Sequence, residues 1–201
     1  MKRLIFLLML FLSPNILQAQ LLESITAKEV LPTVVAKAQT EFASDATLTN
    51  ALFYGVEYQG ITLELNVSDG TATGWLYRFH SPTLDSSVYY VGARVVMLGD
   101  QAIGLPLDTL TKHFPVPPVN VELSEPWVDS DAALQGAKDG GAETFIQNNP
   151  DTQISFAFVI SNPVANRYIP QGKYWLFRFT AEQDTLTCMV HAATALPYRC
   201  F

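Results

Sequence analysis

The sequence contains few charged residues, few cysteines and few histidines. Of its 201 residues 15% are charged and 49% are hydrophobic, and the formal net charge is −7. No cluster of Lys and Arg offsets this acidic balance, which argues against nucleic acid and anionic membrane surfaces as partners. The two cysteines and three histidines do not have the spacing of metal ligands. We therefore expect no metal and no other cofactor.

The sequence also lacks the short motifs of serine hydrolases, zinc proteases and nucleotide-binding enzymes. His80, His113 and His191 stand far apart, so we interpret each as a surface or capped residue rather than a ligand or a general base. Asp129 and Asp131 resemble an acidic pair, but they precede a helical pattern, which favours a helix cap. The sequence thus predicts a protein that is not an enzyme.

Residues 1–19 have the pattern of a secretory signal peptide. Lys2 and Arg3 precede an apolar run at residues 4–12, and Ala19 is a small residue before the expected cleavage site. The apolar run is shorter than a bilayer span, and no later stretch reaches membrane length. No cysteine follows the cleavage site, which argues against a lipid anchor. We expect an exported bacterial protein, periplasmic or extracellular, with no transmembrane segment.

The two cysteines, Cys188 and Cys200, both lie near the C-terminus. An oxidising compartment would allow them to form a disulfide. The alternative is a redox or metal pair, but the spacing is not that of a CxxC motif and no His/Cys cluster completes a metal site. We expect a structural disulfide that ties the C-terminal tail to the last strand.

One five-residue pattern occurs twice: residues 75–79 read WLYRF and residues 175–179 read WLFRF. Side chains on a strand alternate between its two faces, so the aromatic residues of each copy share one face. Such a face requires a partner that buries it, most simply a helix. We expect Trp75 and Trp175 to occupy equivalent buried positions.

The face opposite these aromatic residues is the candidate binding face. It carries a leucine and an arginine from each copy, namely Leu76, Arg78, Leu176 and Arg178. An arginine beside apolar area is typical of protein interfaces. Two other arrangements stay open. Arg78 could form an ion pair with Glu64 across the sheet, or two sheets could pack face to face and hide all four residues.

The repeated pattern predicts an α+β fold of two tandem repeats, each a helix packed on a curved antiparallel β-sheet. The first repeat is expected at residues 20–103 and the second at residues 129–201. A group of prolines marks residues 104–128 as a connector.

Each expected repeat opens with a helix signal. Thr26 and Glu29 match a capping box, and Asp129 precedes the second helical pattern. Gly136, Gly140 and Gly141 would each weaken this second helix. A close approach of the helix to a sheet would explain them.

Residues 190–196 read VHAATAL. This resembles the closing signature V-D-A-x-T-G-x-V of PepSY-type domains, with His191 in place of Asp and Ala195 in place of Gly. The resemblance covers the second repeat and, through the repeated pentad, extends to the first. It implies a helix packed on a curved antiparallel sheet. The family includes peptidase-inhibiting propeptide modules, and tandem β-lactamase inhibitor proteins have a similar plan and bind through the open sheet face.

Together these patterns favour an exported, non-enzymatic binding module with an unknown protein partner, and inhibition of a secreted hydrolase is one such role. The alternative is an envelope-associated structural protein that binds a glycan or another ligand through exposed aromatic residues such as Tyr89 or Tyr90. Fold resemblance does not decide between them, because one fold supports many functions.

Overall fold

The computed structural model describes most of the chain after the expected signal peptide. The described ranges are 22–55, 57–58, 61–62, 64–105, 119–166, 169–182 and 184–201. The expected signal peptide and residues 106–118 of the expected connector lie outside them. His113 lies outside them as well.

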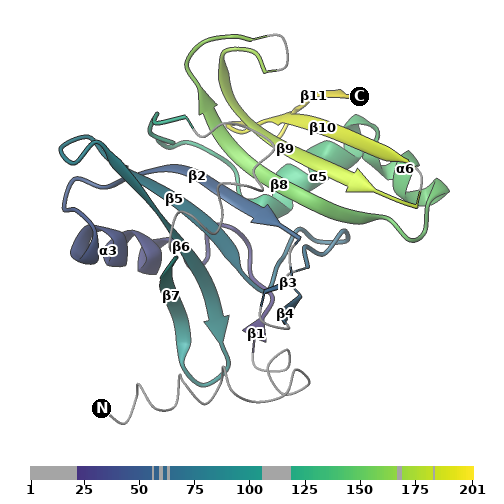
Figure 1. Cartoon of the computed structure of the whole chain (residues 1–201). Helices are drawn as coiled ribbons and strands as arrows, with labels where there is room; N and C mark the ends of the chain where they lie inside the picture. The colour runs from purple at the N-terminus through teal and green to yellow at the C-terminus, as the bar shows by residue number, and fades with distance from the viewer. Residues whose placement is uncertain are drawn as a thin grey trace.

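One antiparallel sheet dominates the described residues (Figure 1). Its strand order is β1-β6-β5-β2-β8-β9-β10-β11. β7 pairs with β6 along the edge opposite the one that β1 and β5 share. The strands are β1 (Leu22–Glu23), β2 (Thr47–Tyr54), β5 (Trp75–Ser81), β6 (Ser86–Val95), β7 (Gly99–Leu105), β8 (Gln153–Asn162), β9 (Gly172–Thr180), β10 (Thr185–His191) and β11 (Pro197–Cys200). A separate pair, β3 (Glu57–Tyr58) and β4 (Ile61–Thr62), forms a small second sheet.

The prediction of two tandem helix-on-sheet repeats is wrong. β2 pairs with β5 along one edge and with β8 along the other, where Asn50 lies opposite Ile160 and Tyr54 opposite Phe156. Strands from both expected repeats therefore lie in one continuous sheet. This pairing satisfies two strand edges that separate sheets would leave open.

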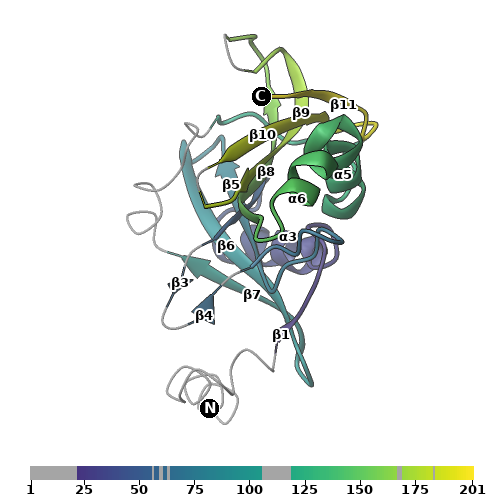
Figure 2. The ribbon, with the colours of Figure 1, turned by 90° about the vertical axis from the view of Figure 1, so that its right-hand side faces the viewer.

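The helices lie on one side of the sheet, as Figure 2 shows. α3 (Leu31–Glu41) packs on β6 and β7, whereas α5 (Ser130–Ala137) and the π-helical segment η1 (Lys138–Ala142) pack on β10 and β11. α6 (Glu143–Asn148) continues from η1. Pro32 lies in the first turn of α3, where its missing N–H leaves no helical bond unmade.

The main core lies between the helices and the sheet. The aromatic residues of both pentads belong to it and are fully buried: Trp75, Tyr77, Phe79, Trp175, Phe177 and Phe179. Each indole Nε1 donates to a backbone carbonyl, Trp75 to Ile25 at 3.0 Å and Trp175 to Val128 at 2.9 Å. The prediction that both tryptophans are buried is confirmed.

The glycines of the second helical segment allow a close approach. A Cβ at Gly136 would lie 2.0 Å from the Ala195 carbonyl oxygen, and one at Gly140 would lie 2.8 Å from the Cβ of Pro197. The predicted close approach is present at Gly136 and Gly140, whose partners are Ala195 and the first residue of β11, but not at Gly141, where a Cβ would meet nothing within 4 Å. The predicted continuous helix is bent, because Gly141 has a φ of 129° inside η1.

Candidate binding face

The face of the sheet opposite the helices carries a second apolar cluster. Its buried members are Leu52, Leu76, Tyr89, Phe156, Phe158, Ile160, Ile169, Tyr174, Leu176 and Met189. The alternation in each pentad does place Leu76 and Leu176 opposite the core tryptophans, as expected. Both leucines are buried, however, so they do not form part of an open surface. Tyr89 and Tyr90, which we expected to be exposed, are buried as well.

Arg78 is buried on this same face, with 5% of its surface exposed. Its guanidinium donates from Nη1 to Thr49 Oγ1 (3.0 Å) and the Val119 carbonyl (3.2 Å), and from Nη2 to Ser87 Oγ (2.8 Å) and Asn120 Oδ1.

These acceptors are neutral, and no carboxylate among the described residues lies within ion-pair distance of Arg78. The ion pair with Glu64 is therefore not formed. Burial lowers the pKa of Arg78. Arg78 therefore holds residues 119–120 against the sheet through its hydrogen bonds.

Arg178 is the one residue of the predicted binding face that is exposed. It lies on β9 between Phe156 of β8 and Thr187 of β10. Its guanidinium carbon lies 6.0 Å from the centre of the Phe156 ring. Within the described part of the chain, no carboxylate lies within ion-pair distance of it. Arg178 thus presents a positive charge on the surface of an acidic chain.

The C-terminal residues extend the surface around Arg178. Thr187 and Phe201 exchange two backbone hydrogen bonds of 2.9 Å, so Phe201 lies in the same cross-strand row as Arg178. Arg199 pairs with Met189 in the next row. Its guanidinium carbon lies 4.7 Å from the centre of the Phe201 ring and 5.8 Å from that of Tyr198.

A β-bulge places Tyr198 on this face together with its neighbour Arg199. The register of β10 and β11 shifts between Met189 and Val190, and such a bulge turns two consecutive side chains to one side. The Tyr198 ring contacts the rings of Tyr174 and His191, with centres 5.5 and 5.4 Å away.

We name this surface the arginine–aromatic patch. It consists of Phe156, Arg178, Tyr198, Arg199 and Phe201. Tyr198 and Phe201 are 44% and 57% exposed. Of these five residues only Arg178 was predicted from the repeated sequence pattern. The predicted disulfide could have pointed to Arg199 and Phe201, because a bond at Cys200 also fixes the positions of its two neighbours.

The patch lies near the β11 edge of the sheet, and a disulfide and helix packing hold this edge in place. A disulfide joins Cys188 of β10 to Cys200 of β11. Among the described strands β11 is the last in the order, so its outer edge has no strand partner there. On the opposite face α5 and η1 pack against β11. These contacts hold the patch residues in place.

The two described histidines take separate roles. Of the expected alternatives, a surface or a capped residue, His80 is not at the surface: it is buried, and its Nδ1 lies 3.1 Å from Ser87 Oγ. His191 packs against the ring of Tyr174, with ring centres 5.0 Å apart. No group of three or more His, Cys, Asp or Glu in the described ranges has the geometry of a metal site.

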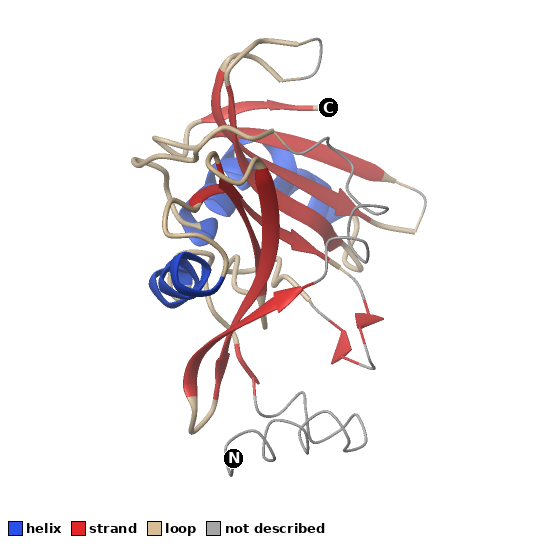
Figure 3. Ribbon diagram, turned by 60° about the vertical axis from the view of Figure 1, so that its left-hand side comes forward, coloured by secondary structure: helices blue, strands red, loops and turns tan. Residues whose placement is uncertain are grey.

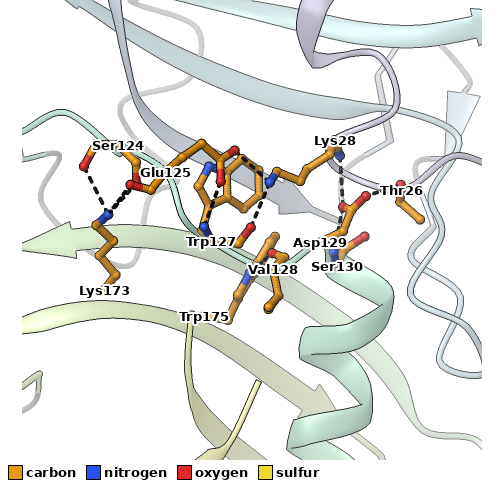
Figure 4. Close-up of polar contacts among 10 residues, drawn as sticks. All are labelled: Thr26, Lys28, Ser124, Glu125, Trp127, Val128, Asp129, Ser130, Lys173 and Trp175. Atoms are coloured by element: carbon orange, nitrogen blue, oxygen red, sulfur yellow. Dashed lines mark hydrogen bonds and ion pairs between the residues drawn. The ribbon is translucent and has the colours of Figure 1, made fainter. Parts of the chain in front are cut away.

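A polar cluster joins the segment before α3 to the segment before α5 (Figure 4). The Asp129 carboxylate accepts hydrogen bonds from Thr26 Oγ1 (2.6 Å), the Lys28 N–H (2.9 Å) and the Ser130 N–H (2.7 Å). Burial raises the pKa of Asp129, and the three hydrogen bonds oppose that rise. Asp129 is a helix cap, as expected, and it also anchors the N-terminal segment.

Lys28 completes this cluster. Its Nζ lies 2.7 Å from Glu125 Oε1, donates to the Trp127 carbonyl at 2.8 Å and sits 4.5 Å from the centre of the Trp127 ring (Figure 4). Thr26 makes half of the predicted capping box, since its N–H donates to Glu29 Oε2 at 2.6 Å. Lys28 and Glu125 form an ion pair, and Asp129 is held by a hydroxyl and two backbone N–H groups, so the role of the cluster is structural.

No family model and no curated protein matches the chain. Among solved structures, a crystal structure named as a "putative lipoprotein" from Clostridium difficile 630 aligns with a TM-score of 0.41 and 10% sequence identity. The alignment covers 85% of this chain and 91% of that chain. A similarity this low carries no argument about function, and the resemblance to PepSY-type domains gains no support from these comparisons.

The described residues include no helix that is both long enough and apolar enough to cross a membrane.

Proposed function

We propose that the chain is an exported, non-catalytic binding module that recognises a protein partner through the arginine–aromatic patch. The observation that carries the proposal is Arg178, an exposed arginine beside Phe156 with no carboxylate within ion-pair distance among the described residues. Arginine and aromatic residues are enriched at protein interfaces, where they supply much of the binding energy. Export is inferred from the leader pattern of residues 1–19.

The chemistry of the patch favours a partner with acidic and apolar groups. Arg178 lies beside the Phe156 ring, which restricts its guanidinium, and its N–H donors suit a carboxylate. Arg199 and the two aromatic rings beside it add apolar and positively charged surface next to Arg178. A secreted hydrolase with an acidic surface is one partner of this kind, and an inhibitor would act by covering it.

A glycan-binding role has weaker support. Sugars stack on open aromatic faces, and Tyr198 and Phe201 are the exposed aromatic residues of the patch. The guanidinium of Arg199 lies close to both rings and competes for their faces. We therefore favour a protein partner.

The test is Arg178→Glu, compared with Lys37→Glu as a matched charge reversal on α3. Lys37 pairs with Glu41 on the helical side of the molecule, far from the patch in the strand order. Proteins from the native compartment are cross-linked to each variant, and the affinity of a captured protein is measured with purified components. We expect Arg178→Glu to weaken binding at least about tenfold, since one such contact is worth more than about 1.4 kcal/mol. Lys37→Glu should bind as the wild type does.

Two outcomes contradict the proposal. One is a partner that binds Arg178→Glu as tightly as the wild type. The other is binding to a glycan array that is lost on Tyr198→Ala while no protein is captured. Melting curves of each variant separate loss of binding from loss of folding.

A further inference from the structure

The hairpin formed by β6 and β7 ends in consecutive exposed apolar residues. The turn consists of Val96, Met97 and Leu98, all exposed, and 95% of the Met97 surface is accessible. Ile103 on β7 is exposed as well. Figure 3 shows this hairpin projecting beyond the rest of the sheet. We refer to residues 96–98 as the hairpin tip.

Local folding does not explain the residues of the hairpin tip. The Leu98 N–H closes the turn on the Val95 carbonyl at 3.0 Å, and Met97 adopts a φ of 74°. That left-handed conformation suits Gly, Asn or Asp, and a side chain such as Met is strained there. The exposed Met97 side chain gains no burial in return. Met97 is disfavoured both by its backbone conformation and by the exposure of its apolar side chain. We take this as an indication that Met97 contacts something outside the chain.

Three charges near the hairpin tip, those of Arg94, Asp100 and Glu29, are paired with one another, whereas Glu23, opposite Arg94, is in no ion pair among the described residues. Arg94 binds Asp100 at 2.7 Å and Glu29 at 3.1 Å. The tip itself carries no charged residue. It therefore offers apolar area without the directional polar groups by which protein partners are usually fixed. An apolar, uncharged tip of this kind suits the region of a bilayer where the headgroups meet the acyl chains.

The position of β1 relates the hairpin tip to the apolar N-terminal stretch of the sequence. Leu22, the first described residue, pairs with Val95 at the base of the tip. The apolar run of residues 4–12 precedes it in sequence. A chain of ten residues spans at most roughly 36 Å. A membrane that held residues 4–12 before removal of the expected leader would therefore lie within reach of the hairpin tip.

We propose that the hairpin tip inserts into the surface of a zwitterionic lipid bilayer. Insertion would bury Val96, Met97 and Leu98 among the lipid headgroups and the first acyl carbons, as apolar side chains at an interface do. The acidic net charge of the chain gives no attraction to anionic lipids. β7 and β11 lie at opposite ends of the sheet, so this contact leaves the arginine–aromatic patch accessible.

The test is flotation of the protein without residues 1–19, which keeps every described residue, with vesicles of phosphatidylcholine. We expect the wild type to float with the vesicles. Met97→Asp combined with Leu98→Asp should lower the bound fraction at least tenfold. Leu84→Asp is the matched control, because Leu84 is an exposed apolar residue in another turn and should be dispensable for binding.

Met97→Gly separates binding from stability. Glycine tolerates the positive φ, so the variant should unfold at a temperature at or above that of the wild type, yet it should bind vesicles more weakly. Adding phosphatidylglycerol to the vesicles should leave wild-type binding unchanged or weaker.

The proposal is overturned if the wild type stays unbound. It is also overturned if the tip variants float as well as the wild type, or if binding requires the anionic lipid.

Discussion

The indole rings of Trp75 and Trp175 meet edge to face, with their centres 6.0 Å apart and their planes at 77°. Each ring is fully buried, and each belongs to one copy of the repeated pentad. The two copies therefore meet in one core. This contact, together with the β2–β8 pairing, predicts that the described fold unfolds as one unit.

A double-mutant cycle tests the Trp75–Trp175 contact. We expect Trp75→Leu and Trp175→Leu each to lower the free energy of unfolding by several kcal/mol, because each leaves a cavity. Trp175→Leu also leaves the Val128 carbonyl without its donor, whereas the Ile25 carbonyl keeps the Ala72 N–H. Their coupling energy should be about 0.5–1.5 kcal/mol, the usual value for an aromatic pair. Urea titration followed by circular dichroism measures both quantities. Additive losses and two separate transitions would contradict a shared core.

Alternation along the strands predicted which residues share a face, but it could not predict what covers that face. Leu76 and Leu176 lie opposite the tryptophans, as the period of two requires, yet they are buried in a second cluster. The pairing of β2 with β8 was also outside the reach of a sequence pattern. A period of two describes one strand and does not identify the strand beside it.

The partners of Arg78 show the same limit. Val119 and Asn120 are distant in sequence, within the expected connector, and no spacing rule relates them to β5. Short-range signals were more informative. The cap at Asp129, the glycines that face the segment before β11 and the pairing of Cys188 with Cys200 all depend on neighbours in sequence or on simple chemistry.

Gly136→Ala should destabilise the protein strongly. The new Cβ would lie 2.0 Å from the backbone oxygen of Ala195, so either the helix or the segment before β11 must move. Overpacking of this kind costs about 1–3 kcal/mol or more. Gly55→Ala is the control, because its Cβ would meet Ser155 at an ordinary 3.5 Å. Equal melting temperatures for the two variants would show that the helix can withdraw from β11 at little cost.

Removal of the disulfide should lower stability by about 3 kcal/mol, the usual cost for a short closed loop. The variant Cys188→Ala with Cys200→Ala tests this by urea titration. Thiol labelling of the denatured, unreduced wild type should find no free cysteine, because both sulfur atoms are in the bond. Two reactive thiols in protein taken from its native compartment would refute this assignment.

Asp129 should make stability depend on pH in an unusual direction. Burial raises the pKa of its carboxyl in the folded state, so folding favours the protonated form. The stability advantage of the wild type over Asp129→Asn should be largest below the unfolded pKa of about 3.9 and should decrease as pH rises through the higher folded value. Denaturant titrations of both proteins between about pH 3 and about pH 7 measure this difference.

Asp45 is the control of opposite sign. Hydrogen bonds from Ser81 and Thr83 lower its pKa to about 2. The contribution of Asp45 to the free energy of unfolding, measured relative to Asp45→Asn, should be complete above the pKa that Asp45 has in the unfolded state. It should be lost as pH falls toward 2. Parallel pH profiles for the two Asn variants would show that the environment of Asp129 does not favour its neutral form.

Arg78 and Arg178 occupy matching positions in the two pentads but should respond differently to substitution. Arg78→Met leaves the Val119 carbonyl and the Asn120 side chain without their buried donor. We expect this to cost about 1–3 kcal/mol, because the buried Thr49 hydroxyl and the half-buried Val119 carbonyl lose a charged donor, whereas water can replace it at the exposed Asn120. Arg178→Met, at an exposed position, should change stability by less than about 0.5 kcal/mol.

Arg78→Lys sharpens this comparison. A lysine keeps the charge but has a single ammonium group, which cannot reach both the Thr49–Val119 pair and the Ser87–Asn120 pair as the two guanidinium nitrogens do. The lysine variant should therefore recover only part of the loss seen in Arg78→Met. Full recovery of the stability lost in Arg78→Met would mean that the charge alone matters. Hydrogen bonds from Arg78 would then not be what holds residues 119–120 against the sheet.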